Sequence, residues 1–392
     1  MQPLKGITVV AIEQAVAAPF ATRQLADLGA RVIKIERPDG GDFARGYDTT
    51  VKGLSSYFVW LNRSKESLTL DLKRPEARQI LARLLERADV LVQNLAPGAP
   101  ERLGTAPADL RARYPALVVC TVSGYGASGP YAHKKAYDLL VQSEVGLLSI
   151  TGTEETPSKV GISVADIAAG MYAYSGVLTA LLAKATTGRG TTIDVSLFDA
   201  LAEWMGYASY YTAYGGSPPR RSGPDHASIA PYGPFSGRDG GHVYLGIQNA
   251  REWIRFCADV LRRPDLADAD RFRTNSLRVQ HRQALHDAIA SAFRDLDAPQ
   301  IIERLEAAQI AYARMNSVAE FVDHPQLTGR DCWREIASPA GPLRALRPPV
   351  RMEDVEPVMN AVPSLGEHSQ AILEELGFDR HTIAAWRQEG VF

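Results

Sequence analysis

Strand-like and helix-like segments alternate along the first half of the chain, and this alternation constrains the fold more than any other feature. A short apolar run at 7–12 is followed by a helical pattern from Pro19 to Gly29, and 32–35 is again strand-like. Two strands separated by one helix form a parallel β-α-β unit with a right-handed crossover. Further strand-like runs lie at 67–72, 90–92, 117–122 and 192–195, and further helical patterns begin at Pro75 and Leu197, the latter running to about Tyr211. The sequence therefore predicts an α/β fold with a parallel sheet.

A change of composition divides the chain into two domains. Turn formers and charged residues dominate at 215–228, which predicts a linker. Beyond it, Arg238-Asp239-Gly240-Gly241 separates two strand-like runs, as in a hairpin, and helical patterns follow. The predicted organisation is a large α/β domain at 1–214, a linker at 215–228, a smaller α+β domain at 229–330, and a connector with a C-terminal segment at 331–392.

Composition excludes several classes of function. The chain has 392 residues, a formal net charge of -2 and no long block of Lys and Arg, so neither nucleic acid nor an anionic membrane is an expected partner. Its three cysteines are scattered without a Cys-x-x-Cys pair, which predicts neither a disulfide framework nor a metal site. We expect a cytoplasmic protein, since the start lacks a signal-peptide pattern and no apolar stretch is predicted to span a bilayer.

Asp166 stands at the start of a small-residue-rich helical pattern that runs from Ile167 to Gly188. One interpretation is structural: the carboxylate caps the helix by accepting backbone N–H bonds. The helix dipole and those N–H groups would keep it ionised at neutral pH. An ionised, partly desolvated carboxylate is also what covalent catalysis on an acyl group requires. The residues alone leave both roles open.

A glycine loop and a set of basic residues follow predicted strands. Residues 124–129 fit the G-x-G-x-x-G dinucleotide pattern, but Pro130 and Tyr131 stand where that pattern needs a helix. The loop is therefore predicted to bring backbone close to some other ligand. Ligands bind beyond the carboxyl ends of parallel strands, so cations there favour an anionic, phosphate-bearing ligand. These cations are Arg37, Arg63, Lys65, Arg102, Lys134 and Lys135.

In several stretches the chain resembles the class III coenzyme A transferases, the family of formyl-CoA transferase and carnitine CoA-transferase. The matching stretches are 25–36, 41–42, 62–65 with 68–73, 124–126 with 129–130, 165–166, and 188–190 with 194–197. The resemblance implies a homodimer of interlocked, ring-like subunits. Each subunit would have a Rossmann-like large domain formed by both chain ends and a smaller inserted domain. No permanently bound cofactor is implied, because coenzyme A enters as part of the substrate.

The resemblance also implies roles for individual residues. Asp166 matches the nucleophile, and Tyr137 and Asp138 match positions near the thioester. Val16 stands where formyl-CoA transferase has a glutamine, and 226–232 replaces that enzyme's glycine-rich loop, so oxalate and formate are not expected substrates. The implied coenzyme A-binding residues are Arg37, Lys65, Arg102, Gly124, Gly126 and Lys135, with backbone N–H groups of the glycine loop as oxyanion donors.

In the implied reaction the Asp166 carboxylate attacks an acyl-CoA to form an anhydride, and the thiolate then makes an aspartyl-CoA thioester. An acceptor carboxylate reverses both steps. The segments 41–48 and 55–62 look most like members that act on C4–C5 dicarboxylates such as succinate, mesaconate, itaconate and citramalate. A desolvated distal carboxylate needs partners, and the candidates are Arg45, His226 and Ser228, with Tyr232 beside them.

Three alternatives stay open at this point. The same pocket could move coenzyme A between the two carboxylates of one dicarboxylic acid. An α-methylacyl-CoA racemase shares the fold, but it uses a histidine where this chain has Tyr137, and a phenol with an ordinary pKa of about 10 is a poor base. A non-catalytic CoA-binding protein would bind the ligand without turnover.

Overall fold

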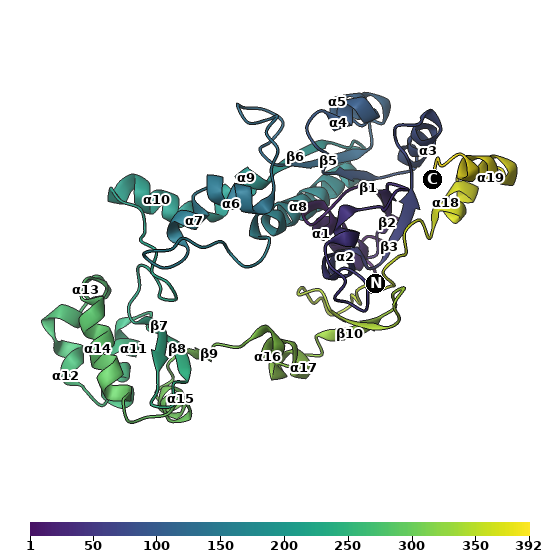
Figure 1. Cartoon of the computed structure of the whole chain (residues 1–392). Helices are drawn as coiled ribbons and strands as arrows, with labels where there is room; N and C mark the ends of the chain where they lie inside the picture. Colours follow the sequence, from purple (N-terminus) through teal and green to yellow (C-terminus); the bar gives the residue numbers. More distant parts are fainter. The chain divides into compact units, whose positions relative to one another are not determined.

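A six-stranded parallel sheet forms the core of the larger of two compact units in the computed structural model, which describes residues 1–392. The strand order is β3-β2-β1-β4-β5-β6, and every neighbouring pair is parallel (Figure 1). The predicted α/β fold with a parallel sheet is confirmed. The strands are β1(Thr8–Ile12), β2(Arg31–Glu36), β3(Lys65–Thr69), β4(Val90–Gln93), β5(Val118–Ser123) and β6(Thr192–Ser196).

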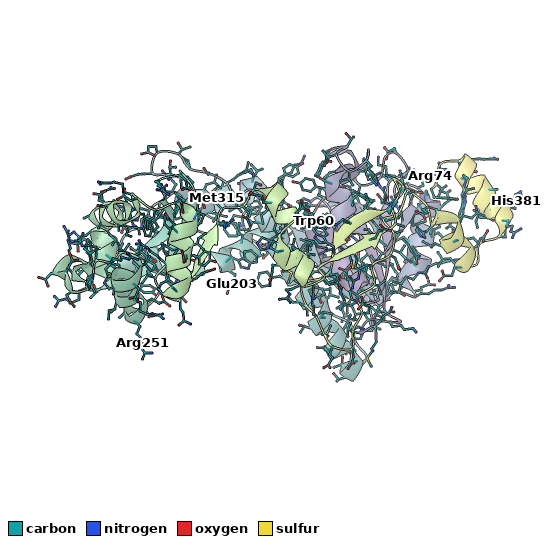
Figure 2. All side chains as sticks on the ribbon, turned by 90° about the horizontal axis from the view of Figure 1, so that it is seen from below. Trp60, Arg74, Glu203, Arg251, Met315 and His381 are labelled. Atoms are coloured by element: carbon teal, nitrogen blue, oxygen red, sulfur yellow. The ribbon has the colours of Figure 1, made fainter.

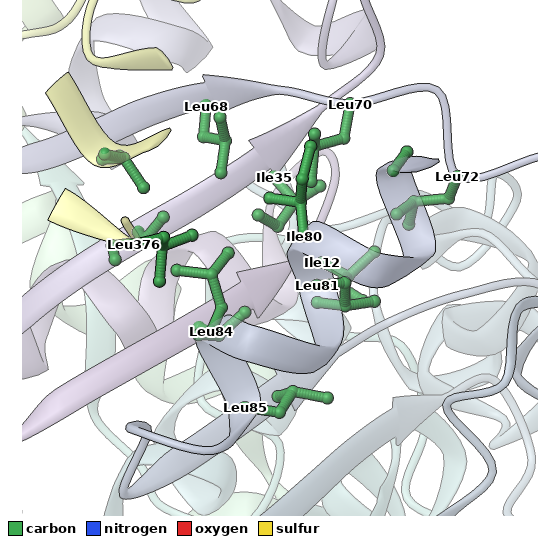
Figure 3. Close-up of a cluster of buried hydrophobic side chains, with 14 of the residues drawn as sticks. Ile12, Ile35, Leu68, Leu70, Leu72, Ile80, Leu81, Leu84, Leu85 and Leu376 are labelled. Atoms are coloured by element: carbon green, nitrogen blue, oxygen red, sulfur yellow. The ribbon is translucent and has the colours of Figure 1, made fainter. Parts of the chain in front are cut away.

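Successive strand residues point to opposite faces, so each face of the sheet needs its own cover. On one face Val10, Ile33 and Leu68 lie in a buried apolar cluster with side chains of four helices. Figure 3 shows part of this cluster, including Leu68 and Leu84. Fully burying one such leucine or isoleucine is worth roughly 1.5–3 kcal/mol. These helices are α3(Pro75–Leu85), α5(Pro107–Arg113), α18(Ser369–Glu375) and α19(Arg380–Gln388).

The opposite face is covered by α1(Ala17–Asp27) and α8(Val164–Thr187), which pack closely on each other. Gly170 makes this approach possible, because a Cβ there would lie 2.7 Å from the backbone oxygen of Ala17. The remaining elements around the sheet are η1(Phe43–Gly46), α2(Ser56–Asn62), α4(Ala99–Leu103), α6(Asp138–Glu144), α9(Leu197–Trp204), α17(Pro325–Gly329), β10(Trp333–Ile336) and β11(Leu343–Leu346).

Two sequence predictions about helices are wrong. The single helix expected from Leu197 to Tyr211 is two helices separated at Met205. In addition, α8 is by length and composition able to cross a membrane, although no such stretch was expected. Contacts of α8 with α1, α9 and β5 are those of a core helix, and such helices pass the same test of length and hydropathy.

The outer edge of β3 is bonded to residues from the far end of the chain. His368 donates its backbone N–H to Ser67 O and accepts the Ser67 N–H on Nδ1, at 3.0 and 3.2 Å. Ser369 Oγ accepts the backbone N–H of Thr69 at 3.1 Å. Further along, Arg74 lies beside the C-terminal helices (Figure 2) and pairs with Glu389.

The chain divides into two compact units. Unit 1 contains the six-stranded sheet and consists of 1–145, 161–205 and 326–392; unit 2 consists of 146–160 and 206–325. The smaller unit thus starts before the predicted linker and includes the segment 146–160, which the composition did not indicate. Residues 216–228 contain no helix or strand.

Unit 2 is built from a short antiparallel sheet and surrounding helices. Its strands are β7(Tyr232–Ser236), β8(His242–Gly246) and β9(Tyr312–Arg314), in the order β7-β8-β9. The hairpin expected at 238–241 joins β7 and β8. The helical elements are α7(Leu147–Ile150), α10(Gly206–Gly215), α11(Ala250–Arg255), η2(Phe256–Val260), α12(Asp265–Asp268), η3(Asp270–Phe272), α13(Asn275–Gln280), α14(Arg282–Phe293), α15(Ala298–Ala307) and α16(Val318–Val322).

Candidate active site

Asp166 lies in the first turn of α8, half-buried, at the carboxyl edge of the sheet. The end of α8 leads into the amino end of β6, so the first turn of α8 lies at the opposite, carboxyl edge of the sheet. The helix begins at Val164 rather than Ile167, and Asp138 rather than Asp166 supplies the capping carboxylate. Oδ1 of Asp138 accepts the backbone N–H groups of Ala165 at 2.7 Å and of Asp166 at 3.4 Å. The capping interpretation of Asp166 is therefore wrong, and its carboxylate does not serve the helix end.

Burial raises the pKa of Asp166 from its ordinary value to about 7, and the nearby Asp138 charge adds to the effect. Removing a carboxylate from water disfavours its charged form, and a second carboxylate disfavours it further. The expectation that helix N–H groups keep Asp166 ionised is thus corrected, since Asp138 accepts two of those groups. Near neutral pH the protonated acid and the nucleophilic carboxylate of Asp166 are therefore both populated. Such a perturbed group beside a partner charge is typical of functional sites.

The Asp138→Asn variant tests this electrostatic pair. An asparagine keeps an oxygen for the two helix N–H groups but removes the negative charge beside Asp166. Since only ionised Asp166 is a nucleophile, kcat/KM of the wild type should rise with pH through a midpoint of about 7 and level off above it. We expect the midpoint of this rise to move to lower pH in the variant. A pH–rate profile measures it, and an unchanged midpoint would contradict the coupling.

Tyr47 is a site residue that sequence reasoning missed. It follows the 3-10 turn η1, and its ring contacts those of Phe43 and Tyr57. Burial raises the pKa of Tyr47 to about 12, and the charges of Asp42 and Asp166 contribute. The hydroxyl therefore stays protonated and can donate a hydrogen bond to an oxygen near Asp166. Its surroundings come from separate segments, which explains why no local pattern marked it.

A cavity of about 410 Å³ lies beyond the carboxyl ends of β1 to β4. Its lining includes the apolar residues Leu70 and Leu72, the cations Arg37 and Lys73, and five carboxylates, those of Glu13, Glu36, Asp39, Asp42 and Asp71. Arg37 was among the predicted cations, and its side chain is 57% exposed. Lys73 was not singled out. Gly390, from the last turn of the chain, also lines the cavity, which no local sequence signal could indicate.

The other predicted cations differ in whether their side chains are exposed or are paired with other protein groups. Arg102 is exposed on α4, next to the cavity-lining Leu103. Lys135 is exposed in the loop before α6. Its neighbour Lys134 pairs with Glu144 and lies over the ring of Tyr131. Arg102 and Lys135 thus keep the exposure that a phosphate-binding role requires.

Lys65 is corrected, because its ammonium group is buried and fully engaged. Nζ donates to Glu13 Oε1 at 2.6 Å, to Asn62 Oδ1 at 3.0 Å and to the backbone oxygen of Pro19 at 3.1 Å. Burial lowers the pKa of Lys65 to about 8, against the opposing effect of the Glu13 carboxylate. Three protein partners use the three donors of the ammonium group. Lys65 therefore stabilises the fold and does not meet coenzyme A phosphates.

Arg45 is corrected for the same reason. Its guanidinium forms a bidentate pair with Glu36, with both N···O distances 2.8 Å, and it lies over the ring of Phe58 at 3.7 Å. The pKa of Glu36 falls to about 2, since bonding and charge from Arg45 and the Lys34 charge outweigh burial. A guanidinium committed to a buried carboxylate is not available to a substrate carboxylate. Arg45 is a structural residue.

Three further predictions need adjustment. Val16 is buried directly before α1, so its side chain belongs to the core and does not form an exposed pocket wall. The N–H of Gly126 is donated to Ser123 Oγ at 2.9 Å and is not an oxyanion donor. A Cβ on Gly124 would lie 2.3 Å from that of Ala136, so this glycine permits close packing. No helix begins directly after the glycine loop at 124–129, since the next helix is α6. The match to the dinucleotide pattern is therefore a chance match.

Tyr137 and Asp138 lie together at the start of α6, where Tyr137 is 69% exposed. In unit 2, His226 and Ser228 lie in the loop before β7. Nδ1 of His226 accepts the Ser228 N–H at 3.2 Å, and the imidazole stacks on the ring of Tyr232. With Nδ1 an acceptor, the neutral ring carries its proton on Nε2.

Comparison with known proteins assigns the chain to a family. The model of CoA-transferase family III matches residues 4–369. The succinyl-CoA:glutarate CoA-transferase of Mus musculus is 32% identical over 100% of this chain and 90% of the mouse protein. The succinyl-CoA:mesaconate CoA-transferase of Haloarcula marismortui is 30% identical over 97% and 98% of the two chains.

Solved structures agree with these matches. A CAIB/BAIF family protein from Brucella suis has 32% sequence identity and a TM-score of 0.83, with 96% of this chain and 99% of that chain covered. A match of the family model over nearly the whole chain leaves no large segment outside the family. The chain therefore belongs to CoA-transferase family III.

Proposed function

We propose that this protein transfers coenzyme A from an acyl-CoA such as succinyl-CoA to a small carboxylate, a C4–C5 dicarboxylate, through covalent intermediates on Asp166. The observation that carries the proposal is the half-buried Asp166 carboxylate, whose pKa is raised to about 7 and which does not cap its own helix. Membership of CoA-transferase family III supports the transfer of coenzyme A. Named relatives act with succinyl-CoA on glutarate and mesaconate, and on D-citramalate, which supports the substrate class.

The first half-reaction begins with attack of the Asp166 carboxylate on the thioester carbonyl. The C–S bond breaks, leaving a mixed anhydride and the coenzyme A thiolate. The thiolate then attacks the Asp166 carbonyl, which releases the donor acid and leaves an aspartyl thioester. An acceptor carboxylate repeats these two steps in reverse order. Neutral Tyr47 is proposed to donate a hydrogen bond to the oxygen that becomes negative beside Asp166.

The coenzyme A moiety is proposed to occupy the cavity beyond β1 to β4. Leu70 and Leu72 of its lining suit the adenine ring, while Arg37 and Lys73 suit the phosphates. Arg102 and Lys135 are proposed to meet the same polyanion from exposed loops. All four cations lie in unit 1 with Asp166. No permanently bound cofactor takes part in this reaction.

A homodimer is part of the proposal. Helix α10 leaves Tyr207, Tyr210 and Tyr214 more than half exposed, at 56%, 70% and 83%. Tyr210 and Tyr214 stack on each other at 6.0 Å, so one helix presents a continuous aromatic surface. Such surfaces are usually covered in a functional assembly. We assign the cover to a second copy of the chain, and a monomeric mass by light scattering would contradict this.

The function is tested with succinyl-CoA and ¹³C-labelled succinate, since label exchange needs no knowledge of the natural acceptor. We expect label to enter succinyl-CoA, and glutarate or mesaconate to compete. Butyryl-CoA, which lacks the distal carboxylate, should be used at least about tenfold less well. A site that binds a charged group disfavours an analogue without it, because the polar groups of the site are then left unpaired. Mass spectrometry measures the labelled succinyl-CoA formed with each of the two donors.

His226 and Ser228 are proposed to bind the distal carboxylate, supported by the Nε2 proton that the ring geometry leaves to His226. His226→Ala should therefore weaken the preference for succinyl-CoA over butyryl-CoA. Asp27→Asn is the matched control, because buried Asp27 is paired with Arg63 and should not affect this preference. Equal use of the two thioesters by the wild type would refute the dicarboxylate specificity.

A further inference from the structure

A buried ionic cluster lies beside the cavity, and no step of the proposed reaction uses it. Its members are Glu13, Lys34, Glu36, Asp42 and Lys65, all buried. Lys34 Nζ lies 2.9 Å from Asp42 Oδ2 and 3.4 Å from Glu13 Oε1. Buried charges persist only when paired in this way, and they are not an efficient source of stability. Three members of the cluster, Glu13, Glu36 and Asp42, line the cavity, which suggests a task beyond stability.

Asp42 is the member that holds the surrounding backbone. Oδ1 accepts the N–H of Ala15 at 3.0 Å and the N–H of Ala44 at 2.9 Å, while its own N–H donates to Glu36 Oε1 at 3.0 Å. Ala15 has a φ of 62°, in the left-handed region that residues other than glycine rarely adopt. The bond from Ala15 to Asp42 therefore maintains a loop conformation that the chain would otherwise leave.

The two backbone segments held by Asp42 belong to different parts of the site. Asp42 itself lines the cavity, together with Glu13 and Gln14 of the loop that contains Ala15. Ala44 belongs to the turn η1, which Asp42 caps and which leads to Tyr47. The charges of both Asp42 and Asp166 act on Tyr47, which places the three groups near one another. One carboxylate thus joins the cavity wall to the turn beside the nucleophile.

We propose that Asp42, locked by Lys34, is a positioning residue that keeps the coenzyme A cavity aligned with Tyr47 and Asp166. This inference rests on the proposed function. Its consequence concerns the aspartyl thioester, which either an acceptor carboxylate or water can attack. With water, the new C–O bond replaces the C–S bond, coenzyme A leaves as the thiol, and Asp166 returns to its carboxyl form. Because water needs no alignment with the cavity, misalignment slows transfer more than hydrolysis.

The test is the ratio of hydrolysis to transfer in the Asp42→Asn variant. Asparagine keeps an Oδ1 acceptor for Ala15 and Ala44 but places an uncharged group against Lys34. With succinyl-CoA and ¹³C-succinate, free coenzyme A reports hydrolysis and labelled succinyl-CoA reports transfer. We expect the ratio to rise about tenfold, since small displacements in an active site have effects of this order. Once the free coenzyme A formed without enzyme is subtracted, the ratio does not depend on how much of the protein is folded.

A matched control is Asp27→Asn. Asp27 is equally buried and forms a bidentate pair with Arg63, at 2.7 and 2.8 Å, at the end of α1 that leads to the amino edge of the sheet. Its loss should lower the thermal stability and leave the ratio unchanged. Arg45→Met is a milder second variant, since Arg45 holds Glu36, which accepts the Asp42 N–H. We expect a rise of about threefold there.

The outcomes distinguish a failure of the proposed function from a failure of the positioning role of Asp42. If wild-type protein exchanges no label, the proposed function fails and the ratio has no meaning. If it exchanges label, an equal rise in Asp27→Asn or an unchanged ratio in Asp42→Asn overturns the positioning role. Should Asp42→Asn not fold, an unchanged ratio in Arg45→Met is sufficient to overturn it.

Discussion

The Asp166→Ala variant is expected to lose coenzyme A transfer by at least about 10⁴-fold, because the nucleophile of both half-reactions is absent. Asp166→Asn should be nearly as inactive, since an amide is a weak nucleophile. Label exchange between succinyl-CoA and ¹³C-succinate measures the loss. In the wild type, succinyl-CoA with hydroxylamine should convert Asp166 to a hydroxamate, which peptide mass spectrometry detects. Undiminished exchange in the alanine variant would remove Asp166 from the reaction.

Stability provides the control that these variants are folded, and it has a definite sign. The pKa of Asp166 is raised in the folded protein to about 7. Its contribution to the free energy of unfolding is therefore largest below the ordinary carboxyl pKa of about 4 and is lost as pH rises through about 7. Asp166→Asn avoids this loss. We expect the variant to be more stable than the wild type at pH 8, by at most roughly 4 kcal/mol, and the difference to vanish near pH 4.

Lys65→Met is expected to lower the free energy of unfolding by about 3–5 kcal/mol, the usual effect of removing one partner of a buried ion pair. Glu13 would keep its charge in the interior with only Lys34 nearby, at 3.4 Å. Urea unfolding measures this change. If kcat and KM of the folded fraction are unaffected while stability falls, Lys65 is a structural residue.

Arg37→Ala is the matched control for Lys65→Met, because its side chain is exposed at the cavity. We expect a stability change within about 0.5 kcal/mol and a raised KM for succinyl-CoA with kcat nearly unchanged, as for loss of uniform binding. The reverse pattern, a stable Lys65 variant with a raised KM, would restore Lys65 as a coenzyme A ligand.

The fold class could be predicted from the sequence because strand and helix periodicities are local. The β-α alternation up to Gly29 and beyond is visible in short windows, whereas the strand order β3-β2-β1-β4-β5-β6 depends on pairing between distant segments. Likewise, Asp166 could be singled out from the sequence as a candidate site residue, but the residues alone left open whether it caps the helix, and the structure shows that it does not. The true cap, Asp138, comes from a segment separated from α8 by a loop and by α7.

The errors about charged residues have one physical cause. Residue type indicates that Lys65 and Arg45 are cations, but whether a cation is free depends on burial and on its partner. Glu13 and Lys65 stand on different strand ends, far apart in sequence, and meet only in the folded sheet. Arg37 and Lys135 were predicted by the same reasoning and remain exposed. Periodicity and composition do not separate these cases.

The bonding of β3 to the segment around His368 has a consequence for synthesis. β3 is one of the two edge strands of the sheet, and an uncovered edge is a template for pairing with other chains. Residues 326–392 leave the ribosome after all of unit 2, so a nascent chain carries β3 with its outer edge open while 206–325 is made. Unit 2, most of which is one continuous segment, can fold during that interval. The nascent protein is therefore most prone to aggregate late in its synthesis, until the residues around His368 cover the sheet.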